Sequence, residues 1–420
     1  MSNDKKPDIR FKNYSDDWEQ RKVTEIGKIY IGLVTTMTKH YTDEGTLLIR
    51  NSDIKDGKFE FGDNPIHLEK SFAEKNETRM HQIGDVITVH TGDVGTSAVI
   101  TENEAKSIGF ATIVTRPNPK IIDSNYLCSF LNTDNHKKWA VSISTGDGRT
   151  NYNLGDYFEL VVPVPSIAEQ KKIASYIQNL NRLITLHQRK YDKLQNLKKA
   201  MLEKMFPKNG SNVPEIRFKG FTDDWEQRKL LDCIQKITDF RGRTPKKLGM
   251  DWSEEGYLAL SAFNVKDGYI DFNQDVHYGN QELYDKWMAG NELHKGQVLF
   301  TTEAPMGNVA QVPDNRRYIL SQRTIAFDVK DKLITENFLA TVLRTPTVFA
   351  DLTALSSGGT AKGVSQKSLA SVEIRLPKDL NEQEKIADTF FNLDHLITLH
   401  QRELEKLKNI KKAMLEKMFV

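Results

Sequence analysis

The densest group of cations in any loop of the chain is Arg241-Gly-Arg243-Thr244-Pro-Lys246-Lys247. Arginine and lysine suit phosphate oxygens and guanine edges, and a glycine between them lets a backbone approach closely. The loop is therefore a candidate for nucleic-acid contact through its two arginines, its two lysines and Thr244. The alternative is an ordinary solvated charged loop.

Two glycine-rich loops form a second, paired set of candidates. They read Gly146-Asp-Gly-Arg149-Thr150-Asn151 and Gly358-Gly-Thr360-Ala-Lys362. Each combines one cation with Thr or Asn, which suits a loop that faces a base or a phosphate. An ordinary turn before the last strand of a domain would look the same.

The remaining candidates are weaker. Arg316, Arg317 and Arg323, the last beside Gln322, form another basic group in the second half of the chain. Residues 90–95 and 301–307 are further candidate loops. Lys39, within residues 35–41, lies where the second half carries its Arg241–Lys247 loop.

The chain carries no recognisable catalytic signature. It has no G-x-x-x-x-G-K-[ST] phosphate loop, no Asn/Asp-Pro-Pro-aromatic run of the kind amino-methyltransferases use, and no glycine-rich cofactor loop after a strand. Asp16-Asp17 is more typical of a cap or surface turn than of a metal site. Cys128 and Cys233 lie far apart, without metal-ligand spacing. We expect no catalytic residue, no metal and no cofactor on this chain.

The composition is that of a soluble globular protein. The 420 residues are 38% hydrophobic and 28% charged, with a net charge of +2, and leave room for two to three domains. A near-neutral chain has no global attraction to polyanions, so any such site must come from local clustering. No apolar run approaches a membrane span, and the polar N-terminus lacks a signal-peptide core. We expect a cytoplasmic protein.

Much of the sequence is written twice. Residues 7–23 and 214–230 agree at 12 of 17 positions at an offset of 207, and LITLHQR occurs at 183–189 and 396–402. KKAMLEKMF occurs at 198–206 and again at 411–419. This pattern indicates a tandem duplication, whose diverged loops suggest two related sites of different specificity. Drift after duplication is the other interpretation.

The duplicated unit is predicted to be α+β with strands dominant. Residues 23–165 and 230–377 hold short β-patterned runs separated by Gly, Asn, Asp and Pro. One helix is expected near 125–141, and its counterpart near 335–352.

A long helix is predicted after each domain. Residues 167–206 contain no Pro or Gly, and their apolar side chains step by four and three, as in a coiled-coil seam. The predicted seam positions are Ile173, Ile177, Leu180, Ile184 and His187, repeated as Ile386, Phe390, Leu393, Ile397 and His400. The two histidines suit a role in helix register, with a metal or proton-switch role as the alternative.

Chain direction implies that the two helices pack antiparallel. Seven residues, 207–213, link the first helix to the second domain, and seven would also span the termini, so the chain resembles a closed ring opened at one of two equivalent joints. The molecule would then have a pseudo-twofold, circular arrangement. The helices also carry many cations. These cations form either a solvated face or a surface that contacts DNA or an acidic subunit. The predicted boundaries are 1–165 for the first domain, 166–206 for its helix, 207–213 for the linker, 214–377 for the second domain and 378–420 for its helix.

This organisation closely resembles the DNA specificity subunit of type I restriction–modification systems. The resemblance rests on the DDWEQRKV and DDWEQRKL blocks, on the Pro-x-x-x-EQ-x-KIA helix entries at Pro165 and Pro377 (one residue longer at Pro377), and on the paired helix ends. It implies two target-recognition domains that read the two halves of a split double-stranded DNA site, and helices that set their spacing.

The resemblance also implies the partners. Two modification (methyltransferase) subunits would dock on the helices and restriction subunits would join them, so that S-adenosylmethionine, ATP and Mg²⁺ lie on the partners and adenine methylation is theirs. Two rival interpretations remain open. One is a coiled-coil adaptor whose two globular ends bind proteins, and the other is a self-contained nuclease or methyltransferase.

Overall fold

The computed structural model describes residues 6–144, 150–208, 210–357 and 362–419. The chain forms two compact units: unit 1 is Met1–Arg189 with Arg402–Val420, and unit 2 is Lys190–Gln401. Each unit holds one domain, the first part of the long helix that follows it and the last part of the other long helix. Within the described ranges, no helix is long and apolar enough to cross a membrane.

The domain of unit 1 is built on an antiparallel sheet of four strands in the order β2-β11-β8-β9. These strands are β2 (Gly27–Ile31), β11 (Ile113–Pro117), β8 (Val86–Thr88) and β9 (Ser97–Val99). A second sheet has the order β10 (Ile108–Phe110), β4 (Thr46–Arg50), β7 (His67–Leu68) and β3 (Tyr41–Thr42), and a hairpin joins β5 (Ile54–Lys55) to β6 (Lys58–Phe59). The helices are α1 (Val23–Ile26), α2 (Lys70–Lys75), α3 (Ser124–Leu131), α4 (Asp134–Ile143) and α5 (Leu154–Phe158).

Unit 2 repeats this plan. Its antiparallel sheet has the order β14 (Ile234–Asp239), β22 (Thr324–Val329), β19 (Val298–Thr301) and β20 (Val309–Gln311). The second sheet is β18 (Tyr278–Gly279), β15 (Tyr257–Leu260) and β21 (Ile319–Leu320), and β16 (Val265–Lys266) pairs with β17 (Tyr269–Ile270). The helices are α7 (Gln281–Met288), α8 (Glu336–Val342), α9 (Pro346–Ala354) and α10 (Gln366–Leu369). The α+β fold in two copies is confirmed.

The central sheet of each unit is buried on both faces. In β19, Val298 and Phe300 pack into the core that α8 shares, whereas Leu299 packs into the core beneath the second sheet. Side chains alternate between the faces of a strand, so a strand with cores on both sides must be apolar throughout. Thus β19, Val-Leu-Phe-Thr, is wholly buried, and the hydroxyl of its one polar residue, Thr301, accepts a hydrogen bond from Asn308 N at 2.9 Å.

The prediction of a single helix near 125–141 is wrong. The structure has two helices there, α3 and α4, which are separated at Asn132 and Thr133. The Thr133 hydroxyl accepts a hydrogen bond from His136 N at 3.2 Å and starts the second helix. The helix expected near 335–352 divides in the same way, because Thr345 caps α9 and Pro346 occupies its first turn.

The shared DDWEQRK blocks form a short strand that joins each domain to its helix. β1 (Glu19–Lys22) pairs with β12 (Val161–Val164), and β13 (Glu226–Lys229) pairs with β23 (Glu373–Leu376). The tryptophan before each first strand is buried, at Trp18 and at Trp225. These blocks therefore recur because they build the same structural joint twice.

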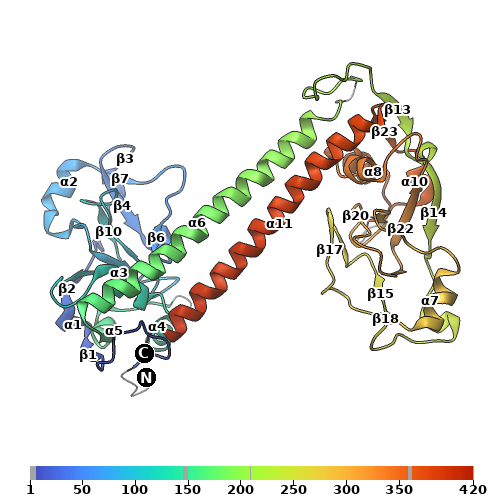
Figure 1. The fold of residues 1–420 in the computed structure, drawn as a ribbon. Helices are drawn as coiled ribbons and strands as arrows, with labels where there is room; N and C mark the ends of the chain where they lie inside the picture. Colours follow the sequence, from blue (N-terminus) through green and yellow to red (C-terminus); the bar gives the residue numbers. More distant parts are fainter. Residues whose placement is uncertain (1–5, 145–149, 209, 358–361, 420) are drawn as a thin grey trace. The chain divides into compact units, whose positions relative to one another are not determined.

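The long helices are α6 (Ile167–Lys204) and α11 (Leu380–Lys417), 38 residues each. In unit 1 the first seam residues of α6, Ile173 to Leu180, share a core with Leu415 near the end of α11 and with Met418 just after it. In unit 2, Ile386, Phe390 and Leu393 of α11 share a core with the end of α6. The start of one helix lies against the end of the other in both units, so the helices run antiparallel, as Figure 1 shows for unit 1.

Both units close in the same way at their ends. In unit 1, Ile9 N donates to Lys417 O at 2.9 Å, and in unit 2 Ile216 N donates to Lys204 O at 2.9 Å. The first contact joins the two termini of the chain, and the second lies across the linker. The predicted circular arrangement implies that the two joints are equivalent in this way.

Candidate nucleic-acid interface

Four segments of unit 2 meet at one end of its central sheet. The residue pairs Asp239–Ile325 and Thr301–Thr324 bring the end of β14, the start of β22 and the end of β19 together. Val364 N donates to Thr302 O at 2.9 Å, which adds the segment before α10. We call this surface the unit 2 loop face, formed by residues 240–249, 302–308, 321–323 and 362–365.

The predicted Arg241–Lys247 loop lies on this face, where half of its cations hold the loop together. The Arg243 guanidinium stacks over Phe240 at 4.3 Å and donates to Trp287 O, and Lys247 Nζ donates to Gly242 O at 2.7 Å. Thr244 accepts a hydrogen bond from Lys247 N and caps a short 3-10 helix, Pro245–Leu248. These three side chains therefore shape the loop.

Arg241 and Lys246, like Lys247, are exposed. Arg241 Nε donates to Asp239 Oδ2 at 2.8 Å but leaves 38% of its side chain exposed. Burial raises the pKa of Asp239, but the bonds and charge of Arg241 outweigh this effect, so that pKa lies below its usual value. The carboxylate stays charged and fixes Arg241 at the edge of the unit 2 loop face.

The structure separates Arg316 and Arg317 from Arg323, which the sequence suggested were one basic group. Arg323 follows β21, lies on the loop face and pairs with Glu303 at 2.9 Å. Arg316 and Arg317 precede β21, at its other end, where Arg316 pairs with Asp314 and lies over the Phe272 and Tyr318 rings. Lys362 is exposed on the loop face, and Thr360 lies outside the described residues.

Unit 1 has a corresponding loop face, formed by residues 89–96, 110–112 and 150–151 with Asn51. Thr91 Oγ1 donates to Asn151 Oδ1 at 2.8 Å, and Asn51 links the segments by accepting from His90 N and donating to Ala111 O. Thr150 is half-buried beside this junction. Arg149 lies outside the described residues.

Lys39 lies in the segment that follows β2, just as the Arg241–Lys247 loop follows β14 in unit 2. It is exposed in a 3-10 turn, Thr38–His40, whose last residue stacks on Phe72 of α2 at 4.1 Å and pairs with Glu69 at 3.0 Å. This turn therefore lies beside α2, as the Arg241–Lys247 loop lies beside α7, where Arg243 donates to Trp287 O.

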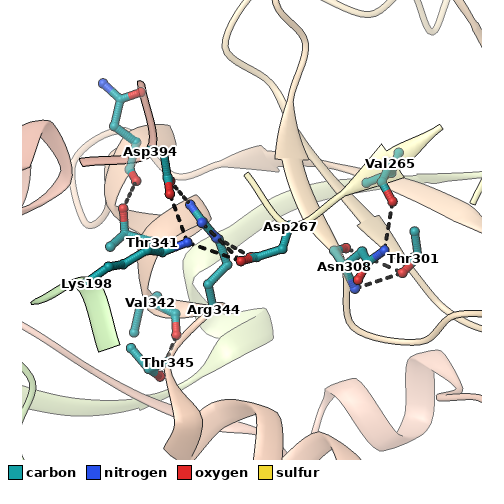
Figure 2. A network of polar contacts seen from close by, with 11 residues as sticks. Lys198, Val265, Asp267, Thr301, Asn308, Thr341, Val342, Arg344, Thr345 and Asp394 are labelled. Atoms are coloured by element: carbon teal, nitrogen blue, oxygen red, sulfur yellow. Dashed lines mark hydrogen bonds and ion pairs between the residues drawn. The ribbon is translucent and has the colours of Figure 1, made fainter. Parts of the chain in front are cut away.

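Two exposed apolar side chains near the loops were not predicted from the sequence. Phe110 is 37% exposed on the unit 1 loop face, and Phe263 is 48% exposed just before β16. Asn308 donates to Val265 O at 2.9 Å, so the Phe263 segment lies next to the unit 2 loop face (Figure 2). Apolar side chains can contact thymine methyl groups or stack on bases. Nothing in the residue pattern distinguishes these two from core phenylalanines.

Polar contacts that both units share fix each domain on its helix. Glu169 accepts two bonds from Arg10 at 2.7 and 2.9 Å, and Glu382 accepts the same pair from Arg217. The neighbouring Gln170 is fully buried and bonds Asp123 N, Ile121 O and Pro165 O. The EQ pairs that mark the helix entries are thus structural anchors.

A second contact joins each domain to the end of the other helix, and here the units differ. In unit 2, Arg344 pairs with Asp267 and with Asp394, and Lys198 pairs with the same two carboxylates at 3.2 and 2.8 Å (Figure 2). Burial lowers the pKa of Arg344, and the two aspartates more than compensate, so its pKa is raised.

In unit 1 the counterpart of this network is the pair Lys411–Asp56, at 2.9 Å, and Lys412 lies 3.6 Å from Asp134 of α4. Asn132 stands where unit 2 has Arg344 and bonds the backbone of Ser97 instead. Ion pairs thus join the domain to the end of the other helix in both units, through different sets of residues.

The seam positions of both helices graduate from buried to half-buried. Ile173, Ile177 and Leu180 are buried, as are Ile386, Phe390, Leu393 and Ile397. Ile184, His187 and His400 are half-buried. Among the described residues no group of three or more His, Cys, Asp or Glu could hold a metal ion.

Comparison with known proteins agrees with this architecture. The family model described as "Type I restriction modification DNA specificity domain" matches residues 15–196 and again residues 222–409. The type I restriction enzyme MjaVIII specificity subunit of Methanocaldococcus jannaschii is 24% identical over 306 residues, covering 70% of this chain and 69% of the relative.

Two further proteins match over most of their length. The type I restriction enzyme EcoKI specificity subunit of Escherichia coli is 21% identical over 391 residues, covering 90% of this chain and 82% of the relative. The crystal structure of a type I restriction–modification S subunit from M. genitalium superposes with a TM-score of 0.61 at 14% identity and covers 99% of each chain, so it shares the fold. The chain therefore belongs to the family of type I restriction–modification DNA specificity subunits.

Proposed function

We propose that this protein is the sequence-specificity subunit of a type I restriction–modification complex and that it binds a bipartite double-stranded DNA target through its two loop faces. One observation carries the proposal. The two units share their anchoring contacts, at Arg10–Glu169 and Arg217–Glu382, while the side chains on their loop faces differ. A scaffold kept constant beneath variable loops is how a protein reads two different half-sites with one fold.

The proposed mechanism leaves the chemistry to partner subunits. The chain holds DNA, and two modification subunits methylate one adenine in each half-site with S-adenosylmethionine. Restriction subunits add ATP- and Mg²⁺-dependent cleavage. The chain contributes position and selectivity and is not itself a catalyst.

Mapping methylated adenines in the genome of the source strain, with and without this gene, tests the proposal. We expect one split motif, methylated on both strands, to disappear when the gene is deleted. Identical maps, together with purified protein that shows no salt-dependent DNA binding, would favour the adaptor function instead.

A further inference from the structure

Unit 1 contains a groove of about 580 Å³ on its helix side, bounded by the β5–β6 turn, α4, the middle of α6 and the end of α11. We call it the basic groove. Its cationic lining residues are Lys58, Lys137, Arg182, Lys408, Lys411 and Lys412.

The groove carries an excess of positive charge. Its lining contains six cations but only three acids, which are Asp56, Asp134 and Glu416. Two of the cations are engaged with these acids, since Lys411 pairs with Asp56 at 2.9 Å and Lys412 lies 3.6 Å from Asp134. Two more pair with acids outside the lining, Lys58 with Glu60 and Lys408 with Glu405 at 3.4 Å, both at exposed positions where such pairs are weak. Arg182 and Lys408 are exposed and Lys137 is half-buried. Among the described residues Arg182 and Lys137 have no ion pair, and an open groove whose lining carries more cations than acids attracts a polyanion.

The duplication supplies an internal comparison. Lys411 and Lys412 recur in unit 2 as Lys198 and Lys199, and Lys198 keeps the contact with the domain. The other four cations do not recur. At the equivalent positions unit 2 has Tyr269 for Lys58 and Phe349 for Lys137. It has His395 for Arg182 and Gln195 for Lys408. Because unit 2 folds in the same way without them, these four cations are not needed to hold the domain on the helices.

The groove adjoins the unit 1 loop face. Gly57, in the turn that borders the groove, donates to Ser97 O at 3.0 Å, next to the 89–96 loop. On α4, His136 packs beneath the same loop, because a Cβ added at Gly95 would lie 3.1 Å from its Cε1. Lys137, the next residue of α4, lines the groove. A duplex lying on the loop face would therefore have its backbone within the reach of these cations.

We propose that the basic groove binds the phosphodiester backbone of double-stranded DNA next to the half-site that unit 1 reads. The inference rests on the proposed function and adds a contact that only one of the two units makes. Backbone contacts position the duplex and contribute affinity, but carry no base information. Unit 1 therefore holds its half-site partly through the groove, whereas unit 2 relies on its loop face, which carries the Arg241–Lys247 loop.

The test uses the full chain with Arg182→Gln, Lys408→Gln and the double variant, and measures the dissociation constant for a duplex carrying the target motif over a range of KCl concentrations. Each lost phosphate contact should reduce the slope of log affinity against log salt by about 0.9 and weaken binding by up to about eightfold at 0.1 M salt. The ratio of affinities for target and scrambled duplex should stay constant, because no base contact is removed.

Lys406→Gln is the matched control. Lys406 is an exposed lysine in the same part of α11 that does not line the groove, so its slope should equal that of the unmodified chain. Urea unfolding of all variants should be unchanged, because the side chains replaced are exposed.

Three outcomes would overturn the inference in distinguishable ways. Salt slopes of the groove variants equal to that of Lys406→Gln would refute the groove contact while leaving DNA recognition intact. Unchanged DNA binding with lost binding of the modification subunits would identify a protein-docking surface instead. Failure of the unmodified chain to bind DNA in a salt-dependent way would contradict the proposed function itself.

Discussion

Arg344 is the residue on which the contact between domain and helix in unit 2 depends. Its side chain is only 9% exposed and neutralises both Asp267 and Asp394 (Figure 2). We expect Arg344→Ala to lower the free energy of unfolding of unit 2 by about 2–3 kcal/mol, less than for a fully buried pair because Asp267 is largely exposed.

Urea unfolding followed in unit 2 measures this effect. Lys286→Ala, which removes an exposed pair with Glu282 on α7, is the control and should change stability by less than about 0.5 kcal/mol. Equal effects of the two substitutions would show that Arg344 does not hold the network together.

Two buried histidines make unit 1 sensitive to acid. Burial lowers the pKa of His81 and of His136 to about 4. Between pH 6.5 and about 4 the unfolded chain binds protons that the folded chain does not, so stability falls as pH falls, by about 2–3 kcal/mol for each histidine.

Hydrogen exchange compared at pH 7.5 and pH 5 tests this prediction. Amides of β8 and β11 in unit 1 should lose protection relative to those of β19 and β22 in unit 2. Replacing His136 by Gln should reduce the pH dependence even though it destabilises unit 1 at both values. Equal acid responses of the two units would contradict the prediction.

At the scale of elements, the proposed function gives the two long helices the role of setting which half-sites can be read together. Each begins in one unit and ends in the other, with the apolar seam repeating every seven residues. Adding one heptad to both helices preserves that repeat and lengthens each by about 10.5 Å, roughly three base pairs of duplex.

We expect this insertion to move the preferred spacer between the half-sites, or to abolish binding, without altering the bases preferred in either half. Binding selection from a library of split sites with variable spacers measures both properties. A two-residue insertion is the control, since it rotates the seam by about 200° away from its partner and should disrupt packing. An altered base preference at an unchanged spacer would rule out a ruler role.

At the scale of the whole chain, the duplication makes its two joints equivalent. Ile9 contacts Lys417 as Ile216 contacts Lys204, so neither joint depends on where the chain begins. We expect a circular permutant, with its termini linked and new ends within 207–213, to fold with an unfolding midpoint close to that of the parent.

Circular dichroism during urea unfolding checks this, with new ends placed inside α6 as the control, which should be strongly destabilised because the helix is cut. A permutant opened in 207–213 that fails to fold would show that the linker does more than connect.

The sequence by itself determined the features that depend on local pattern and on repetition: the two-copy plan, the long helices, their seam from Ile173 and Ile386, and the family. These follow from periodicity and from identical blocks, which are properties of neighbouring residues along the chain. Helix breaks such as the one at Asn132 and Thr133 depend on a capping side chain and were not predicted from the sequence.

Only the tertiary structure decided which cations act together. Arg316 and Arg323 are close in sequence but lie at opposite ends of β21, whereas Lys58, Arg182 and Lys408 are far apart in sequence and line one groove. The reason is physical: an exposed loop or helix face carries no periodic signal for its long-range neighbours. Their contacts are set by sheet order and by the antiparallel helices, and these form only when the whole chain packs.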